Sequence, residues 1–353
     1  MSRKLTPPTA TVTAMDVARL AGVSQSAVSR VFTPGASASR ETIEKVRKAA
    51  AQLGYRPNAL ARAMITGKSR IIGLVVAYLE NQFYPVALER LSRALQSRGY
   101  HILIFLAGNG EENVTEVVQE LIDYRVDGII TASVALSNDL TARLAELGIP
   151  VVNFNRGQED PRLTDITSDN IAGGQRATEF LIAAGHTRIA HIMGWQGAST
   201  GRDRAEGFRR AMAQAGLAPL AMIDGKYDRD AAISATREIF RAGQAPDAIF
   251  VANDHMAFAV MDELRFAMGL DVPGDVSVIG YDDVPMAAWP AYDLTTIRQP
   301  VNRMVSATVE AILGLIESDL QPRKTHIIGP LIMRRSARLP QDTARFLHPE
   351  EES

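Results

Sequence analysis

The feature that most constrains the fold is an alternation of short apolar runs with helical patterns, repeated between residues 71 and 282. The apolar runs are IIGLVV (71–76), HILIFL (101–106), GIITAS (128–133), PVVNF (150–154), RIAHIMG (188–194), AIFVAN (248–253) and VSVIGYD (276–282). Helical spacing lies between them, at 84–98, 112–124, 138–147, 170–185, 204–215, 229–242 and 254–268. This alternation predicts parallel β-α-β units with helices on both faces of each sheet.

A change of pattern near Thr167 predicts two such sheets, and therefore two lobes. A helix expected at 300–317 and strands near 324–328 and 331–335 follow the second set, so we expect them to cross back between the lobes. The predicted parts are a head (1–57), a hinge helix and linker (58–70), a two-lobed body (71–338; lobe 1 about 71–167 plus 300–330, lobe 2 about 168–299 plus 331–338) and a flexible acidic tail (339–353).

Charge is distributed unevenly along the chain. Residues 1–70 hold 12 Lys and Arg against 3 Asp and Glu, a balance of +9, whereas the remainder carries −11 and the whole chain −2. A basic head on an acidic body favours a polyanionic partner for the head. A solvated basic tail is the alternative that charge alone leaves open.

The head carries the pattern of a helix-turn-helix, within DVARLAGVSQSAVSRVF (16–32). Thr13 is the predicted N-cap of a first helix, in a near capping box, and Gly22 can end that helix with a positive φ. Ser24 is predicted to cap the second helix. A third helix is expected from residue 39 to about 53, where apolar residues recur at helical spacing.

The second helix leaves a small and polar outer face. Such a face suits a major groove, because long side chains would hold the helix away from the base edges. Gln25, Ser26 and Arg30 can hydrogen-bond to bases. The predicted DNA-contacting residues of this region are Thr13, Ser24, Gln25, Ser26, Ser29 and Arg30. A three-helix bundle without a ligand is the alternative.

The next segment is YRPNALARAMITGKSR, residues 55–70. Pro57 is predicted to end the third helix, and Asn58 can cap a short helix that runs to about Ile65. Because a helix this short is unstable alone in water, we expect it to fold only when it pairs with something. The GKS tripeptide does not belong to a phosphate-binding loop, since that motif needs glycine where Arg62 stands.

TAMDVARLAGVSQSAVSRVF and SRETIEKVRKAAAQLGYRPNALARAM resemble the lactose/galactose repressor (LacI/GalR) family of bacterial transcription regulators. The resemblance implies that hinge helices of two protomers pair in the minor groove of DNA, at positions that include Asn58, Ala61 and Met64. Members of that family usually wedge open a base step with a leucine, which Met64 replaces here. Methionine is apolar and flexible, so it can still act as a wedge.

The resemblance covers roughly residues 12 to 338 and includes GHTRIAHIMG, RAEGF, VANDHMA, VSVIGYDD and LTTIRQP. It implies an α/β chain with an N-terminal helix-turn-helix head of three helices and a hinge helix. The body is then expected to resemble a periplasmic binding protein, with two lobes of parallel sheets flanked by helices.

Ligands of open α/β sheets bind beyond the carboxyl ends of the strands, where this sequence has aromatic, Asn, Asp and Arg side chains. These side chains suit a polyhydroxylated ring, which stacks on aromatic faces and forms hydrogen bonds to polar groups through its hydroxyls. By resemblance, the effector-contacting positions are Phe83, Asn155, Arg204, Tyr227, Asn253 and Asp282. Asn155 replaces a common aspartate near Arg156 and Arg202, which favours an acidic sugar or sugar phosphate. The alternative is structural, since Asn and Asp at strand ends often cap the next helix.

Motifs of catalysis and metal binding do not occur: there is no GxSxG, HExxH, GxGxxG or complete phosphate loop. His186 and His191 have poor spacing for a shared metal, and the adjacent Asp282 and Asp283 point to opposite faces of a strand. Cysteine is absent, which excludes disulfides and thiolate metal sites. We therefore expect no enzyme activity, no catalytic residues, no metal and no cofactor.

The longest apolar run, Ile71–Leu79, is too short to span a bilayer, and MSRKLTPPTATVT lacks the apolar core of a secretory signal. The sequence thus predicts a cytoplasmic homodimeric repressor that binds a pseudo-palindromic operator in double-stranded DNA. A sugar, sugar acid or sugar phosphate is expected to control its operator affinity. Residues 340–353 contain no leucine heptad for a tetramer. The alternatives are a periplasmic-type solute-binding protein without a DNA role and a purine-type co-repressed regulator.

Overall fold

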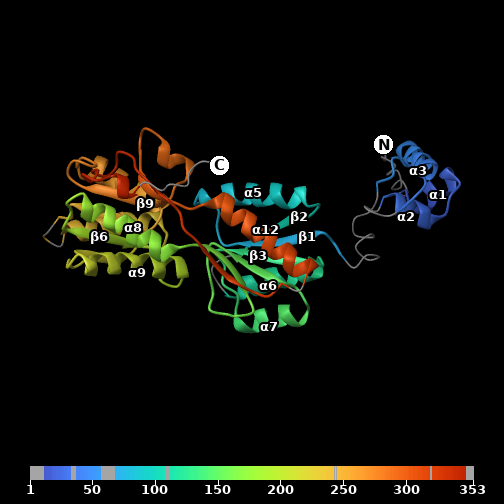
Figure 1. Cartoon of the computed structure of the whole chain (residues 1–353), viewed down its shortest axis with the longest axis horizontal. Helices are drawn as coiled ribbons and strands as arrows, with labels where there is room; N and C mark the ends of the chain where they lie inside the picture. Colours follow the sequence, from blue (N-terminus) through green and yellow to red (C-terminus); the bar gives the residue numbers. More distant parts are fainter. Residues whose placement is uncertain are drawn as a thin grey trace, which may run out of the picture. The chain divides into compact units, whose positions relative to one another are not determined.

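The computed structural model describes residues 12–32, 37–56, 68–107, 111–241, 243, 245–318 and 320–346. They belong to two separate units, the head (up to Ser69) and the body (from Arg70), which are described one at a time (Figure 1). The head contains the helices α1 (Ala14–Ala21), α2 (Gln25–Val31) and α3 (Arg40–Leu53).

The helix ends of the head lie where capping residues predict them. Thr13 and Asp16 form a capping box at α1, and Gly22 ends that helix with a φ of 64°. Ser24 caps α2 by accepting the N–H of Ala27, at 3.2 Å. These three sequence predictions are confirmed, and each turn is determined by the chemistry of its own residues.

The core of the head is small. Its buried side chains come from all three helices and are mostly valine and alanine: Val17, Ala18, Val28, Val46, Ala49 and Ala50. Short side chains let the helices pack closely. The core uses only the inner face of α2, so its polar outer face takes no part in packing.

Lobe 1 of the body is built on a six-stranded parallel sheet in the order β11-β5-β4-β3-β1-β2. Its strands are β1 (Ile71–Val76), β2 (His101–Leu106), β3 (Gly128–Ala132), β4 (Val151–Phe154), β5 (Thr164–Ser168) and β11 (Lys324–Ile327). Its helices are α5 (Phe83–Ser97), α6 (Glu111–Asp123), α7 (Asn138–Glu146) and α12 (Val301–Glu317). Helix α12 packs on α5 and against β3, β4 and β5 (Figure 1).

Lobe 2 has a second six-stranded sheet, in the order β12-β10-β9-β8-β6-β7. The strands are β6 (Ile189–Met193), β7 (Ala221–Asp224), β8 (Ala248–Val251), β9 (Ser277–Asp282), β10 (Thr295–Arg298) and β12 (Leu331–Ile332), and only β12 is antiparallel to its neighbour. The helices are α8 (Asn170–Ala183), α9 (Ser199–Gln214), α10 (Arg229–Arg241), α11 (Asp254–Asp262), the π-helical η1 (Glu263–Ala267) and the 3₁₀ turn η2 (Pro285–Ala288). Among all described helices, none is both long and apolar enough to cross a membrane.

All seven predicted apolar runs form strands, which confirms the α/β fold class. The pattern missed β5 and β10 because polar residues interrupt their apolar character, and it missed β7 because this half-buried edge strand has only three apolar residues. In β5 (TDITS) even the polar side chains are buried. Asp165 there pairs with Lys324, at 2.8 Å, and accepts a hydrogen bond from Asn153. A strand whose polar groups are paired inside the protein cannot be recognised by hydrophobicity alone.

The chain passes from one lobe to the other after β5, after β10 and after β11. Neither lobe is therefore a continuous piece of sequence. The three crossings lie beside one another and form the connection between the lobes (Figure 1).

The expectation of a flexible tail from residue 339 is wrong as far as residue 346. The chain turns through η3 (Ala344–Phe346), and Phe346 is only 2% exposed. Its ring meets that of Phe180 edge-on, with centroids 5.2 Å apart, and its carbonyl oxygen accepts a hydrogen bond from Arg176. A large aromatic ring gains more from burial in lobe 2 than the ordered backbone loses in entropy.

Candidate functional site

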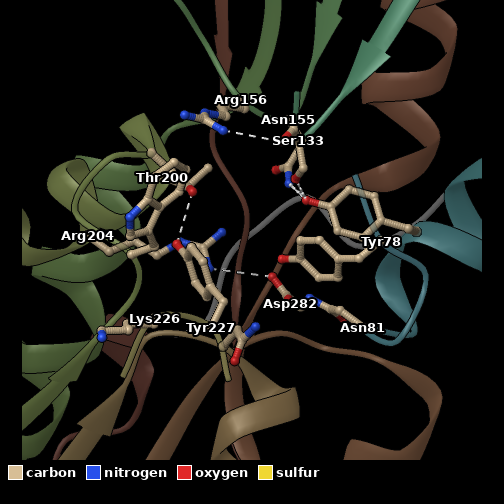
Figure 2. A pocket seen from close by; sticks show the side chains of 14 residues that line it. Tyr78, Asn81, Ser133, Asn155, Arg156, Thr200, Arg204, Lys226, Tyr227 and Asp282 are labelled. Carbon is tan, nitrogen blue, oxygen red and sulfur yellow. Dashed lines mark hydrogen bonds and ion pairs between the residues drawn. The ribbon is translucent and has the colours of Figure 1, made fainter. Parts of the chain in front are cut away.

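A cavity of about 250 Å³ lies between the lobes of the body, beyond the carboxyl ends of the strands (Figure 2). Lobe 1 contributes Tyr78, Asn81, Tyr84, Ser133, Asn155 and Arg156, and lobe 2 contributes Trp195, Ala198, Thr200, Arg204, Lys226, Tyr227, Asn253 and Asp282. The lining residues follow β1, β3, β4, β6, β7, β8 and β9, which is where open α/β sheets bind ligands. We call this cavity the cleft.

The structure brings Asn155, Arg204, Tyr227, Asn253 and Asp282 together in the cleft, as the sequence predicted. Phe83 is the exception. It is 4% exposed and stacks on Phe154, with ring centroids 6.0 Å apart, so it belongs to the core beneath the cleft. Its neighbour Tyr84 lines the cleft instead. Helical phase decides which of two adjacent aromatics faces the cavity, and that phase was not evident from the residue types.

Arg204 and Asp282 form the buried charge pair of the cleft. Their side chains are each 2% exposed and approach to 3.6 Å. Arg204 also donates hydrogen bonds to the Ala252 carbonyl and to Asn170 Oδ1, and its guanidinium lies 3.6 Å from the centre of the Tyr281 ring. Burial raises the pKa of Asp282, and the guanidinium of Arg204 opposes that rise. The pair is stable because each charge has both a partner and hydrogen bonds.

Asp282 also connects the two lobes. Its carboxylate accepts a hydrogen bond from Asn81 of lobe 1 and another from Gln299, both at 2.8 Å. The next residue, Asp283, points elsewhere and pairs with Arg298 and Arg334. Two adjacent carboxylates thus have separate partners, at a strand end where the backbone leaves the extended conformation, with a φ of 123° at Asp282 and 56° at Asp283.

Two amides in the cleft keep unused hydrogen-bonding atoms. Asn155 donates to the Tyr84 hydroxyl at 2.9 Å, which leaves its buried Oδ1 without a partner. Asn253 caps α11 by accepting the N–H of Met256, which leaves its buried Nδ2 without a partner. The structural alternative is therefore half correct for Asn253, which caps a helix and also presents a donor. One free acceptor and one free donor suit a ligand hydroxyl, which can both donate and accept.

Aromatic rings form much of the remaining wall: Tyr78, Tyr84, Trp195 and Tyr227. Tyr227 donates its hydroxyl hydrogen bond to Thr200, at 2.9 Å (Figure 2). A Cβ on Gly194 would lie 2.1 Å from the Tyr227 ring, so glycine is required for the ring to lie against the strand end. Sequence reasoning missed Tyr78, Asn81 and Ser133, although all three follow strands and the same strand-end rule could have found them.

The head presents a second polar surface, on α2. Ser24, Gln25, Ser26, Ser29 and Arg30 are exposed, as is Thr13 before α1. Thr13 and Ser24 already use their hydroxyls in helix caps, whereas Arg30 forms no ion pair with any described residue. Asn58, Ala61 and Met64, the residues predicted for the hinge, lie outside the described residues.

Comparison with known proteins agrees with this division into head and body. Residues 13–58 match the family described as bacterial regulatory proteins, lacI family. Residues 178–337 match the periplasmic binding protein-like domain.

Two curated relatives match almost their whole length. The HTH-type transcriptional repressor PurR of Vibrio campbellii is 34% identical over 331 residues, which is 92% of this chain and 98% of that protein. The ribose operon repressor of Escherichia coli K12 is 32% identical over 330 residues, 92% of this chain and 99% of that protein. Among solved structures, the lac repressor dimer bound to operator and the anti-inducer ONPF matches with a TM-score of 0.83, 27% identity and coverage of 92% and 98%. The chain therefore belongs to the lacI family of bacterial regulatory proteins.

Proposed function

We propose that this protein is a cytoplasmic, homodimeric transcriptional repressor whose affinity for operator DNA is controlled by a sugar or sugar derivative bound in the cleft. The observation that carries the proposal is the cleft itself, where a free amide acceptor and a free amide donor lie between aromatic faces and a buried charge pair. A polyhydroxylated ring can stack on such aromatic faces and form hydrogen bonds to such polar groups.

Binding of DNA is assigned to the head. The exposed polar face of α2 fits a major groove, and Arg30 has no partner among the described residues and can contact a guanine. A single head makes few base contacts, so two heads on two-fold related half-sites are needed for affinity. The lac repressor, which is similar over 92% of this chain, is a dimer on its operator.

Control by the ligand is assigned to the connection between the lobes. The cleft is lined from both lobes, and Asn81 of lobe 1 already bonds to Asp282 of lobe 2. A ligand that bonds to both lobes favours one arrangement of the lobes over others. The coupling free energy between effector and operator is then limited by the difference in the ligand's binding free energy between those arrangements.

No catalytic activity is proposed. Two groups of the cleft that could act as acid or base are engaged, since Asp282 is paired with Arg204 and the Tyr84 hydroxyl is hydrogen-bonded to Asn155. Burial raises the pKa of Tyr84 to about 12, so this phenol stays protonated at neutral pH.

The test uses the full chain and an operator selected from random DNA by repeated binding. Operator affinity is measured by fluorescence anisotropy, with sugars, sugar acids, sugar phosphates and purines added in turn. We expect one class of compound to shift the operator Kd. Asp282→Asn should weaken the response to that compound about 10- to 100-fold in ligand concentration, since a charge-assisted hydrogen bond contributes about 1.5–3 kcal/mol.

Asp283→Asn is the matched control, because the adjacent carboxylate faces away from the cleft. It should keep the wild-type ligand response. Equal responses of the two variants would contradict the assignment of the effector site. A purine as the active compound would favour the purine-type alternative.

A further inference from the structure

Charge in the cleft is not balanced. Its lining includes the cations Arg156, Arg204 and Lys226 and a single carboxylate, Asp282. Asp282 is engaged by Arg204, at 3.6 Å. Among the described residues, Arg156 and Lys226 have no acidic partner. Lys226 is exposed, so water can solvate its charge. Arg156 is only 9% exposed, so its lack of an acidic partner needs an explanation.

Arg156 is held in position without a counter-charge. Its guanidinium lies 4.9 Å from the centre of the Trp195 ring and donates to the carbonyl oxygens of Ser133, at 3.2 Å, and Gly197, at 2.9 Å. Two of its five N–H groups are used in this way. Burial lowers the pKa of Arg156, and the nearby charge of Arg202 lowers it further. A buried cation with free donors and no anion costs free energy, which a bound anion can offset.

A helix begins at the same end of the cleft. Helix α9 starts at Ser199, and its N-cap, Ala198, provides no side-chain hydrogen bond to the first turn. Ala198 and Thr200 line the cleft, and the carbonyl of Gly197 that accepts from Arg156 directly precedes them. Figure 2 shows Arg156 and Thr200 on the same side of the cavity, with Lys226 farther away. The partial positive charge of an uncapped helix N-terminus adds to that of the guanidinium.

We infer that the ligand of the cleft is an anionic sugar derivative, with its carboxylate or phosphate held by Arg156 and the first turn of α9. The inference rests on the proposed function and specifies the class of effector. The sugar hydroxyls then face the free Asn155 Oδ1 beside Arg156, the free Asn253 Nδ2 and the Asp282–Arg204 pair, all of which line the same cavity. A cavity of about 250 Å³ is small for a ligand site, which suits one sugar ring with one acidic group.

The position of Arg156 also links the anion to both lobes. Arg156 belongs to lobe 1 and bonds to Gly197 of lobe 2, and beside it the N–H of Gly157 donates to Ser199 Oγ, at 3.0 Å. An anion between Arg156 and α9 bonds to both sides of this contact. A neutral sugar with the same hydroxyls does not make that connection.

The experiment measures ligand affinity of the full chain by calorimetry, without DNA. The probes are matched sets that share ring stereochemistry: D-glucose, D-glucuronate and glucose 6-phosphate, and the corresponding galactose and mannose sets. We expect an acidic member to bind at least about tenfold more tightly than its neutral partner. The carboxylate and phosphate arms identify which anion is preferred.

Arg156→Gln should remove this preference, and Arg156→Lys should keep part of it. Arg202→Gln is the matched control: Arg202 also carries a positive charge near Arg156, but it is exposed and does not line the cleft, so this variant should keep most of the wild-type preference. Neutral sugars that bind as tightly as their acids, or a preference that survives Arg156→Gln, would overturn the inference and leave the cleft as the effector site.

Inorganic phosphate decides the case in which none of these sugars binds. At constant ionic strength, phosphate should raise the Tm of the wild type and of Arg202→Gln more than that of Arg156→Gln, because a ligand stabilises the state that binds it. A rise that is equal in all three proteins overturns the inference. Failure of the proposed function would appear differently, as operator binding that no bound ligand changes.

Discussion

The outer face of α2 and the cleft of the body are both polar, and each contains an arginine that we assign to recognition. In the head, Arg30 is exposed and free of ion pairs with described residues. In the cleft, Arg204 is buried, paired with Asp282 and stacked on Tyr281. The head can carry its polar face because water solvates it, whereas the cleft can carry its polar groups only because they satisfy one another.

In the head, a side chain can therefore contribute to recognition without contributing to stability, whereas in the cleft the same side chains contribute to both. Removal of a solvated side chain leaves little behind, so its effect is confined to the partner it contacts. Removal of one member of a buried network leaves the others unpaired in a low-dielectric interior. Substitutions in the two regions should therefore differ in the free energy of unfolding even when both abolish a binding event.

The largest effect is expected for Arg204→Ala. It leaves Asp282 without its counter-charge and the Ala252 carbonyl and Asn170 Oδ1 without their donor. We expect the free energy of unfolding of the body to fall by about 3–5 kcal/mol, as for other broken buried pairs. Urea unfolding followed by tryptophan fluorescence measures this, because Trp195 and Trp289, the only two tryptophans, both lie in the body.

Arg202→Ala tests whether burial is the cause of that loss. The exposed Arg202 is two residues away on the same helix and should change the free energy of unfolding by less than about 0.5 kcal/mol. If both variants lost a similar amount of unfolding free energy, burial would not be the cause of the loss in Arg204→Ala.

A smaller effect is expected from His191, which lies beneath the cleft in β6. Its ring stacks on Phe250, with centroids 4.5 Å apart, and burial lowers its pKa to about 3. The unfolded chain binds a proton near its ordinary pKa of about 6.5, so this residue stabilises the protein above that pH. Stability is lost as the pH falls from about 6.5 toward about 3.

His191→Gln should remove this part of the pH dependence. Between about pH 6.5 and about pH 5, the wild type should lose about 1–2 kcal/mol more than the variant. His101→Gln, at an exposed position in β2, should follow the wild type. Parallel pH profiles of wild type and His191→Gln, from denaturant unfolding at each pH, would show that the buried imidazole contributes nothing.

The smallest effect on stability is expected for Arg30→Ala. The exposed side chain should contribute less than about 0.5 kcal/mol to folding of the head, as judged by thermal unfolding followed by circular dichroism. Its loss should weaken binding to the selected operator by about 1–3 kcal/mol and binding to random DNA much less. A clear drop in Tm would show that Arg30 also stabilises the head, so that recognition and stability would not be separate there.

Local chemistry made some features predictable from sequence and left others out of reach. Thr13, Gly22 and Ser24 determine helix ends through their own side chains or backbone freedom, so the head could be outlined correctly. The strand-end rule found Asp282 because it depends only on where an apolar run stops. The buried polar strand β5 and the docking of Phe346 depend on partners far along the chain, such as Lys324 and Phe180.

The same limit applies to the charge of the cleft. The types and positions of the arginines are evident from the sequence: Arg156 and Arg202 favoured an acidic ligand, and Arg204 was an effector-contacting position by resemblance, but Arg202 does not line the cleft. Which of them is neutralised by Asp282 depends on how α9 packs beside the end of β9 within lobe 2, and the free state of Asn155 Oδ1 depends on the Tyr84 hydroxyl that its amide nitrogen meets. Pairing across a fold is a tertiary property, which residue types near strand ends do not specify.

The three crossings between the lobes have a consequence for synthesis of the chain. Lobe 1 begins at β1 but needs the buried Met304 and Ile312 of α12 for its core and β11 for its edge. A ribosome that has made lobe 2 up to β10 still holds an incomplete lobe 1, with the apolar surface that α12 covers facing the solvent. The head needs only residues before 57 and can fold first, since domains generally fold as units from the N-terminus during translation. A nascent chain therefore presents the polar face of α2 long before its cleft is complete.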